Sequence, residues 1–428
     1  MPVGLYISVP FCRTKCSYCN FASDVFSKSA FENYVARVIE DIARSRETAS
    51  GLGCSLDESV DSIYLGGGTP SILDGAQLLR IFKAVRDQFA VTRDAEITVE
   101  CAPGTLTSAL IETLQQCGVN RVSLGVQSFV DQEARAVGRL HKRSTVIEEV
   151  ARLRAAGVEA INIDLIAGLP HQTEESWKFS LAETVAVGAP HASVYMLEVD
   201  EDSRLGRELI AGGTRYHAHF VPDEDAMADF YLRACETLNA AGVAQYEISN
   251  FARPGAESQH NLKYWTRQPY MGFGVDAHSM LPVVGRVTSA ARAAGADDAQ
   301  TAALKRCATH TPVVESVRFA TPDSLDGYMM RVPHTVTLVP RRAAIEESFF
   351  LGLRLNRGVD LEGLRTEFTP EAISPFEPAI GECEGEGLLE RDGGRVRLTD
   401  RGRLLSNEVF ARSLGETAAE EEKWEPAT

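Results

Sequence analysis

The N-terminal part of the chain alternates short apolar runs with longer helical patterns. Six runs rich in β-branched or aromatic residues predict strands at 5–9, 62–67, 96–101, 121–126, 160–166 and 191–197. Apolar residues recur at helical spacing over 30–45, 75–88, 107–116, 144–156 and 223–241. Gly118, Gly157 and Gly242 follow three of these helices, where a left-handed residue commonly ends a helix. The alternation predicts an α/β fold in which βα units form a partial barrel or an open, doubly wound sheet.

The pattern changes after residue 282. Residues 283–345 include an Ala-rich, weakly patterned stretch at 286–312 and are predicted to be a linker or insertion. Residues 346–412 predict helices and a strand pair with a Gly-Gly turn in "ERDGGRVRLTD", as in a small winged-helix-like α+β module. An acidic tail follows at 413–428. We therefore expect a core of residues 1–282, this linker, the C-terminal module and the tail.

Composition argues against some partners and compartments. With 43 Lys+Arg against 60 Asp+Glu the formal net charge is -17, so attraction to phosphates should not drive function and no nucleic acid partner is expected. No run reaches the roughly 18 apolar residues of a membrane span, and "MPVGLYISVP" lacks the features of a signal peptide. The nine cysteines are an odd number. We expect a cytoplasmic protein whose cysteines are thiols or metal ligands.

Three cysteines stand close together directly after the first predicted strand, at Cys12, Cys16 and Cys19 in "PFCRTKCSYCNF". A loop with this spacing lets three thiolates converge on one inorganic centre. A structural zinc ion would need a fourth Cys or His nearby, but Phe21 stands two positions after Cys19. Three cysteines on an iron–sulfur cubane would instead leave one iron open. Zinc and three unrelated buried thiols remain as alternatives.

Polar and glycine residues gather at the ends of the later predicted strands. The stretch "GGGTP" at 66–70 closes the second strand, where a plain turn is the alternative to a ligand contact. No GK[ST] follows for a phosphate loop, and Ser71 takes the place of the third glycine of a dinucleotide-binding pattern. Further polar residues at or after strand ends are Glu100, Gln127, Arg139 and Asp164. One alone could be a cap, but four at one mouth of a βα array predict a binding site.

The CxxxCxxC spacing after a first strand resembles the radical S-adenosylmethionine (SAM) superfamily. The resemblance implies a 4Fe-4S cluster on Cys12, Cys16 and Cys19, with SAM chelated to the open iron. It also implies an electron donor if SAM is cleaved. The SAM site that it suggests comprises Tyr6, Gly67, Gly68, Thr69, Glu100, Gln127, Arg139 and Asp164. In that site carboxylates would accept from the ribose hydroxyls and the amino group, and a guanidinium would hold the SAM carboxylate. Tyr6 could equally be a core residue.

A wider set of motifs narrows the resemblance to the coproporphyrinogen oxidase-like branch. These motifs are "YISVPFC", "CSYCNF", "YLGGGTPS", "SLGVQSF", "LGRLH", "IDLIAGLP" and "YEISNFARPG", and the similarity covers most of 3–282 and about 346–410. In the HemN-type oxidases a further Cys follows the third by two positions. This chain has Phe21 there, as in the HemW relatives, which are regarded as haem chaperones. Coproporphyrinogen dehydrogenase activity is therefore not expected.

The segment "HNLKYW" matches a motif that the same resemblance associates with HemW. Its His260, Tyr264 and Trp265 offer an imidazole ligand and two aromatic faces for haem, although a capping or core segment is the alternative. Two functions stay open. One is a chaperone that binds haem and delivers it to apo-haemoproteins, meeting membrane surfaces only through such clients. The other is a radical SAM enzyme, such as an oxygen-independent coproporphyrinogen III oxidase or a methyltransferase.

Overall fold

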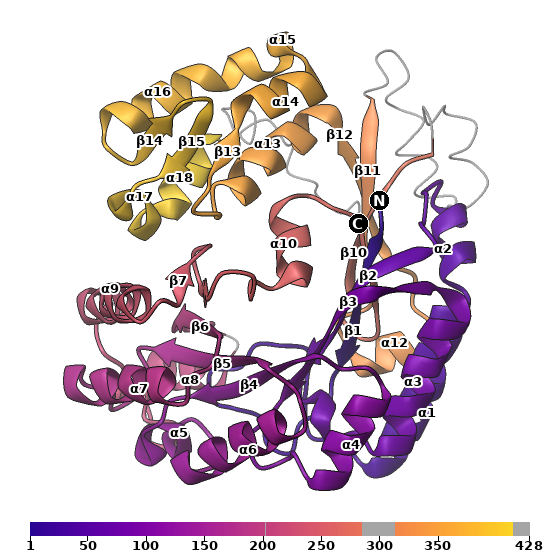
Figure 1. Cartoon of the computed structure of the whole chain (residues 1–428), viewed down its shortest axis with the longest axis vertical. Helices are drawn as coiled ribbons and strands as arrows, with labels where there is room; N and C mark the ends of the chain where they lie inside the picture. The colour runs from indigo at the N-terminus through magenta and orange to yellow at the C-terminus, as the bar shows by residue number, and fades with distance from the viewer. Residues whose placement is uncertain (202, 285–312, 414–428) are drawn as a thin grey trace.

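A single large sheet organises the molecule, as the computed structural model shows for residues 1–201, 203–284 and 313–413. Within these residues the sheet has twelve strands in the order β12-β11-β10-β9-β1-β2-β3-β4-β5-β6-β8-β7 (Figure 1). The parallel strands are β1 (Val3–Val9), β2 (Ser59–Gly67), β3 (Ala90–Cys101), β4 (Arg121–Gln127), β5 (Ala160–Ala167) and β6 (His191–Met196). The predicted α/β fold with six βα strands is confirmed.

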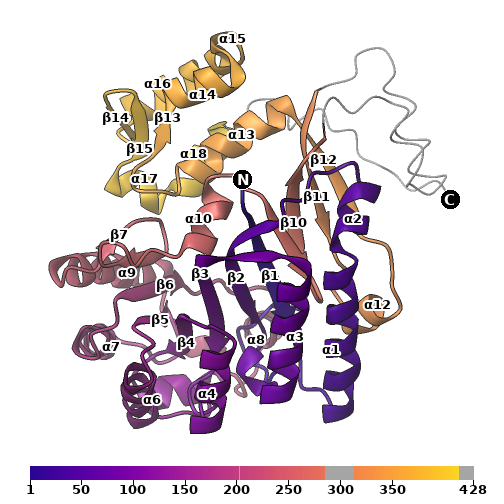
Figure 2. The same ribbon diagram turned by 45° about the vertical axis from the view of Figure 1, so that its right-hand side comes forward.

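Helices pack on the outer face of the parallel strands (Figure 2). They include α1 (Lys28–Ala43), α2 (Ser45–Gly51), α3 (Gly75–Gln88), α4 (Ser108–Gln116), α5 (Asp131–Ala136), α6 (Arg143–Ala155), α7 (Glu174–Ala186) and α9 (Glu224–Ala240). Helix α8 (Arg204–Ala211) instead contacts the cysteine loop, where the N–H of Leu205 donates to the carbonyl of Ser17 at 2.8 Å. The parallel strands are buried on both faces, as such strands usually are. On β1 every position is buried except Tyr6. Gly118, Gly157 and Gly242 all have positive φ, as expected for residues that end helices.

Short strands continue the sheet on both sides of the parallel core. Beyond β6 lie β8 (Asn250–Ala252) and β7 (Ala244–Gln245), and beside β1 lie β9 (Tyr270–Phe273), β10 (His278–Pro282), β11 (Val314–Ala320) and β12 (Thr335–Pro340). β9 is parallel to β1, whereas β10, β11 and β12 pair antiparallel. Part of the segment that the sequence suggested as a linker, 283–345, thus contributes β11, β12 and α12 (Leu325–Met329). The Ala-rich stretch 286–312 lies outside the described residues.

The C-terminal unit has its own core and a small antiparallel sheet. Its elements are α13 (Arg341–Gly352), β13 (Val359–Asp360), α14 (Leu361–Phe368), α15 (Pro370–Ile373), α16 (Glu377–Gly385), β14 (Leu389–Asp392), β15 (Arg395–Leu398), α17 (Asp400–Leu404) and α18 (Ser406–Ser413). In the sheet order β13-β15-β14, Asp392 pairs with Arg395, so Gly393 and Gly394 form the predicted two-residue turn. The predicted α+β module is confirmed. The tail after Ser413 lies outside the described residues.

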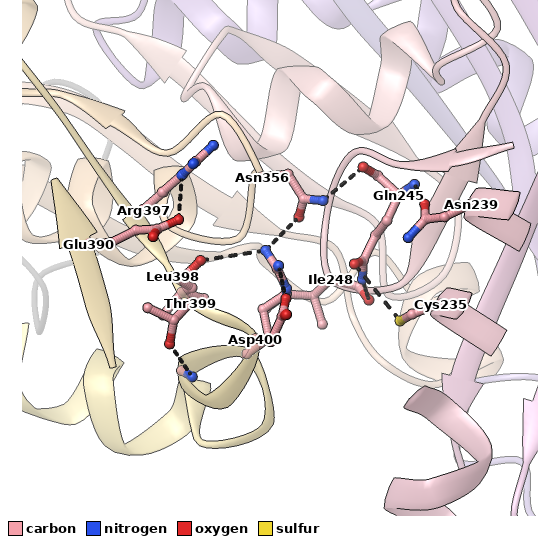
Figure 3. Close-up of polar contacts among 12 residues, drawn as sticks. Cys235, Asn239, Gln245, Ile248, Asn356, Glu390, Arg397, Leu398, Thr399 and Asp400 are labelled. Atoms are coloured by element: carbon pink, nitrogen blue, oxygen red, sulfur yellow. Dashed lines mark hydrogen bonds and ion pairs between the residues drawn. The ribbon is translucent and has the colours of Figure 1, made fainter. Parts of the chain in front are cut away.

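Asn356 joins the C-terminal unit to the main sheet (Figure 3). Its side-chain amide donates to the backbone carbonyl of Gln245 at 2.7 Å, and its backbone N–H donates to Tyr246 at 2.9 Å. Arg403 donates to the side-chain oxygen of Asn356 at 3.3 Å. These bonds attach the module to the β7–β8 edge. No helix in the described part of the chain is long and apolar enough to span a bilayer.

Candidate functional site

The cysteine loop leaves the end of β1 and is closed at its base by backbone hydrogen bonds. The N–H of Cys12 donates to the carbonyl of Asp24, and the N–H of Asp24 donates to the carbonyl of Pro10, both at 3.0 Å. Within the loop the N–H of Cys19 donates to the carbonyl of Cys16 at 3.3 Å. All three cysteines are free thiols. The loop therefore holds three thiols at the carboxyl end of a central strand.

Two of the predicted SAM residues contact the cysteines directly. Thr69 Oγ1 lies 3.7 Å from the sulfur of Cys12, and Arg139 Nη1 lies 3.6 Å from the sulfur of Cys16. Burial raises the pKa of Cys12 and of Cys19, so both thiols remain protonated at neutral pH without a bound cation. A positively charged metal centre would reverse that preference and deprotonate them.

The donor set fits an iron–sulfur cluster. In such a cluster each cysteine binds a different iron, so the sulfurs need not surround one ion. Among the described residues, no group of three or more His, Cys, Asp or Glu side chains is placed so that it could hold one metal ion. Hydroxyl and guanidinium donors beside the sulfurs, from Thr69 and Arg139, would stabilise charged thiolates.

The glycine stretch after β2 lies against the cysteine loop. Gly68 donates its N–H to the carbonyl of Val9, and Thr69 donates to the carbonyl of Phe11, both at 2.8 Å. A Cβ on Gly68 would lie 2.8 Å from each of these carbonyl oxygens, which real Cβ atoms do not tolerate. Gly67 has a φ of 101°. The glycines are therefore required for this backbone to approach the strand end that carries the cysteines.

Glu100 on β3 and Asp164 on β5 are partly buried carboxyls on two strands that β4 separates. Glu100 accepts hydrogen bonds from the hydroxyl of Tyr64 at 2.9 Å and from the N–H of Gly67 at 3.1 Å. Burial, together with the charge of Asp164, raises the pKa of Glu100 to about 8. Asp164 accepts from Ser123 at 2.9 Å, and burial raises its pKa as well. The pair favours a cationic ligand, because a nearby positive charge would let both carboxyls ionise.

Gln127 and Arg139 complete the predicted polar group at the end of β4. Gln127 has a φ of 69°, which is uncommon outside glycine, and its buried Oε1 has no hydrogen-bond partner in the described structure. Arg139 donates through Nη2 to the carbonyl of Gly125 and leaves its buried Nε without a partner. Unsatisfied buried polar atoms of this kind are expected where a ligand binds.

A cavity of about 310 Å³ opens beside the glycine stretch and the cysteine loop, and Glu100, Gln127, Arg139 and Asp164 are not among its lining residues. Its walls are Tyr6, Ser8, Phe21, Ala22, Ser23, Gly67, Gly68, Tyr264, Tyr270, Val275, Asp276 and His278. Of the residues predicted from sequence, Tyr6, Gly67, Gly68 and Tyr264 therefore share one cavity. Phe21, whose position distinguishes the chain from the HemN pattern, is 62% exposed at this cavity. The cavity size lies at the lower end of the range for small-molecule sites.

The three residues of "HNLKYW" that were predicted to bind haem point in different directions. They lie on α10 (Gln259–Trp265), between the sheet and the C-terminal unit (Figure 1). Tyr264 lines the cavity. His260 is 1% exposed, with Nδ1 3.0 Å from Ser62 Oγ and Nε2 2.8 Å from Tyr264 Oη. Trp265 is not among the residues that line the cavity, and the guanidinium of Arg354 lies 5.1 Å from its ring centre.

Burial lowers the pKa of His260 and keeps its imidazole neutral. Desolvation, and secondarily the charge of Lys263, lowers the pKa of His260 to about 3. Below it, Glu96 accepts hydrogen bonds from the backbone N–H groups of Gln259 and His260, both at 3.0 Å. The helix is thus fixed at its first turn by a carboxylate from β3. In this arrangement both imidazole nitrogens of His260 are engaged.

Sequence reasoning missed Tyr64, which contacts Glu100, and also missed part of the cavity wall. Tyr64 is paired in register with Tyr6 on the neighbouring strand, and it is the donor that holds Glu100. The sequence did contain a sign of this pairing, because both tyrosines interrupt apolar strands at the same register. Tyr270, Asp276 and His278 come from β9, β10 and the turn between them. These short strands carry too little alternation to be recognised before the sheet is known.

Two protein-family models match parts of this chain. The radical SAM superfamily model matches residues 6–182, and the HemN C-terminal domain model matches 339–405. The Heme chaperone HemW of Lactococcus lactis is 32% identical over 96% of this chain and 97% of that protein. The Heme chaperone HemW of Bacillus subtilis is 32% identical over 96% of this chain and 99% of that protein.

A solved structure shares the whole fold. Coproporphyrinogen III oxidase (HemN) from Escherichia coli, described as a radical SAM enzyme, superposes with a TM-score of 0.76 at 22% identity. The match covers 96% of this chain and 90% of that one. At this identity the likeness concerns the fold. By the identity and coverage of its relatives, the chain belongs to the HemW family of the radical SAM superfamily.

Proposed function

We propose that this protein is a haem chaperone that carries a 4Fe-4S cluster, binds SAM and haem, and delivers haem to apo-haemoproteins. The observation that carries the proposal is the aromatic cavity, which adjoins the cysteine loop through Phe21 and Ser23. Two relatives that match along almost their whole length are named heme chaperones. Specific clients and an electron donor are expected partners of this activity.

Cys12, Cys16 and Cys19 would hold the cluster, which supplies an open iron for SAM and, when reduced, one electron. Thr69 and Arg139 support the sulfurs of Cys12 and Cys16, at 3.7 and 3.6 Å. Their donors lower the cost of the thiolate charge. This chain's contribution at the cluster is therefore to position three sulfurs and leave one coordination position open.

The carboxyls and amides at the strand ends would bind SAM. Glu100 and Asp164 offer acceptors to its ammonium and ribose hydroxyls, and their raised pKa values favour a cationic ligand. Gln127 offers a buried carbonyl oxygen without a partner. Gly67 and Gly68 keep side chains away from the ligand. Each contact of this type would contribute about 0.5–1.5 kcal/mol, or more where a charge is involved.

Tyr264, Tyr270 and Phe21 would contact haem, while Tyr6 in the same cavity stays assigned to SAM. Haem presents a large apolar face, and burying it is favourable by about 25 cal/mol per Å². Aromatic walls contribute further through stacking. Phe21 lines the cavity and is 62% exposed, so its ring is accessible to a ligand there. A porphyrin face bound in the cavity would cover this surface.

The decisive experiment is anaerobic reconstitution of the full chain, followed by titration with haem and by transfer to an apo-haemoprotein. We expect saturable binding at micromolar haem and a Soret change when the acceptor is added. A Tyr264→Ala variant should bind haem more weakly, whereas Phe220→Ala, which removes an exposed aromatic elsewhere, should not. In parallel, coproporphyrinogen III is offered with SAM and a reductant. Its conversion to protoporphyrinogen IX, without haem binding, would contradict the proposal and favour the oxidase.

A further inference from the structure

His278 presents a free imidazole to the cavity. Among the described residues that line the cavity it is the only histidine, and its side chain is 69% exposed. No hydrogen bond joins either ring nitrogen to another residue in the described parts of the chain. Asp276 Oδ1 lies 3.6 Å from Nε2, which is too long for a hydrogen bond. A neutral imidazole with a free nitrogen is the most common protein ligand of haem iron.

The turn that carries His278 is rigidly held. Between β9 and β10 the chain passes through Gly274 at φ 97° and Asp276 at φ 53°. The N–H of Val275 donates to the hydroxyl of Tyr34 at 3.1 Å, and the N–H of Asp276 donates to the carbonyl of Pro322 at 2.9 Å. A non-glycine residue in the left-handed region persists only where its surroundings fix it, and such positions cluster at functional sites.

The tyrosine and serine hydroxyls in the cavity are poor iron ligands. Burial raises the pKa of Tyr6, Tyr264 and Tyr270, so all three are neutral phenols at physiological pH, and a tyrosine ligand to haem binds as phenolate. Ser8 and Ser23 offer only neutral hydroxyls. Tyr264 and Tyr270 are therefore suited to contact the macrocycle and leave coordination to another group.

His260 is blocked by its own contacts. Its two nitrogens lie 3.0 and 2.8 Å from hydroxyls of Ser62 and Tyr264, and the residue is 1% exposed. To reach an iron atom it would have to lose both hydrogen bonds and leave the helix packing. Leaving two buried hydroxyl partners unsatisfied would be costly. His260 and His278 are the same residue type, but only the side chain of His278 is accessible to a ligand in the cavity.

We infer that His278 supplies the imidazole ligand to the iron of haem in the cavity, while His260 positions Tyr264 in its wall. The inference rests on the proposed haem-binding function and assigns the ligand within it. It also implies that the iron lies near the turn at Asp276, with the macrocycle extending toward Phe21 and Tyr264.

The test compares His278→Gln, His260→Gln and, as a matched exposed control, His219→Gln in the full, anaerobically reconstituted chain. Each is titrated with ferric haem and, separately, with metal-free protoporphyrin IX, and Soret difference spectra and EPR are recorded. His278→Gln should weaken haem binding about tenfold or more and remove the imidazole signature. Its binding of metal-free porphyrin should stay unchanged, and added free imidazole should restore the spectrum. His219→Gln should match the unaltered chain.

The outcomes separate this inference from the function on which it rests. If the unaltered chain shows no saturable haem binding, the proposed function fails and the ligand assignment with it. If the unaltered chain binds haem and His278→Gln keeps its affinity and imidazole signature, only the assignment is overturned. Loss of the imidazole signature in His260→Gln with normal folding, and its retention in His278→Gln, would return the ligand to His260.

Discussion

The hydroxyl of Tyr64 donates a hydrogen bond to the carboxyl of Glu100 across neighbouring strands β2 and β3, at 2.9 Å. The same carboxyl accepts from the N–H of Gly67 at 3.1 Å. These two donors do not fully offset its burial, and the charge of Asp164 acts in the same direction as burial. The pKa of Glu100 therefore lies at about 8, far above the value of a free glutamate.

Glu100 should make stability fall as the pH rises. Between about pH 4.5 and 8 the folded protein holds a proton that the unfolded chain has released, so deprotonation destabilises the fold across this window. In the ligand-free protein Glu100→Gln should raise the melting temperature at pH 8 and leave it unchanged at pH 4. An exposed control, Glu112→Gln, should have no effect at either pH. Thermal unfolding monitored by circular dichroism measures these melting temperatures. Equal melting curves of Glu100→Gln and the unaltered protein at pH 8 would exclude a raised pKa of Glu100.

Binding of SAM should favour the ionised form of Glu100 instead of the protonated form. A cationic group beside Glu100 favours its ionised form, so SAM binding below pH 8 should release a proton. Calorimetry in two buffers of different ionisation enthalpy measures this release. Glu100→Gln should abolish it. If the unaltered protein and Glu100→Gln release the same number of protons, the positive charge of SAM does not lie beside Glu100.

Two substitutions of Gln127 should separate the effect of losing its side chain on SAM binding from the effect of backbone strain on stability. Gln127→Gly and Gln127→Ala both delete the buried carbonyl that lacks a partner, and each should weaken SAM binding roughly two- to tenfold. Gly suits a φ of 69°, whereas Ala does not, so Ala should be the less stable by about 1 kcal/mol. Urea unfolding and calorimetry measure the two effects. Unchanged SAM affinity in both variants would remove Gln127 from the site.

The bond between His260 and Tyr264 should be visible as a coupling energy. Tyr264→Phe leaves the buried Nε2 of His260 without its partner, and we expect a loss of about 1–3 kcal/mol in unfolding free energy. His260→Gln should cost a similar amount. A double-mutant cycle in urea should then give less than the sum of the single losses. Strict additivity would show that the contact does not stabilise α10.

Each of Cys12, Cys16 and Cys19 should be required for iron binding. Replacing any one by Ala should greatly reduce iron and sulfide content after anaerobic reconstitution, because three thiolates hold the cluster in our proposal. Cys54→Ala, which removes a buried thiol outside the loop, is the control and should retain the metal. A triple variant that still holds about four irons would exclude this site.

The parallel core could be predicted from sequence because its strands and helices carry strong local patterns. The predicted helix at 75–88 coincides with α3, and the predicted strand at 160–166 differs from β5 by one residue. The cysteine loop and the glycine stretch were recognisable because their residue types and spacing are set by chemistry. The structure adds the contacts of Thr69 and Arg139 with the sulfurs, which no local pattern encodes.

The part of the cavity wall that β9, β10 and α10 supply could not be predicted, because it depends on strand order and packing. β9 and β10 are four and five residues long, yet β9 lies beside β1 at the centre of the sheet. Likewise, nothing in "HNLKYW" indicates that His260 is buried while Trp265 meets Arg354. Both facts follow from where α10 packs between two units. Tertiary placement therefore decides which members of a motif face the ligand.

The position of β1 between β2 and β9 has a consequence for how the protein can be shortened. β1 pairs through Ile7 with Phe273, far along the chain, and the cysteine loop begins directly after it. A fragment that ends at residue 182, where the superfamily match ends, would leave β1 as an exposed edge strand. Such an edge invites pairing between chains. Soluble fragments that retain the cluster loop should therefore extend beyond Phe273.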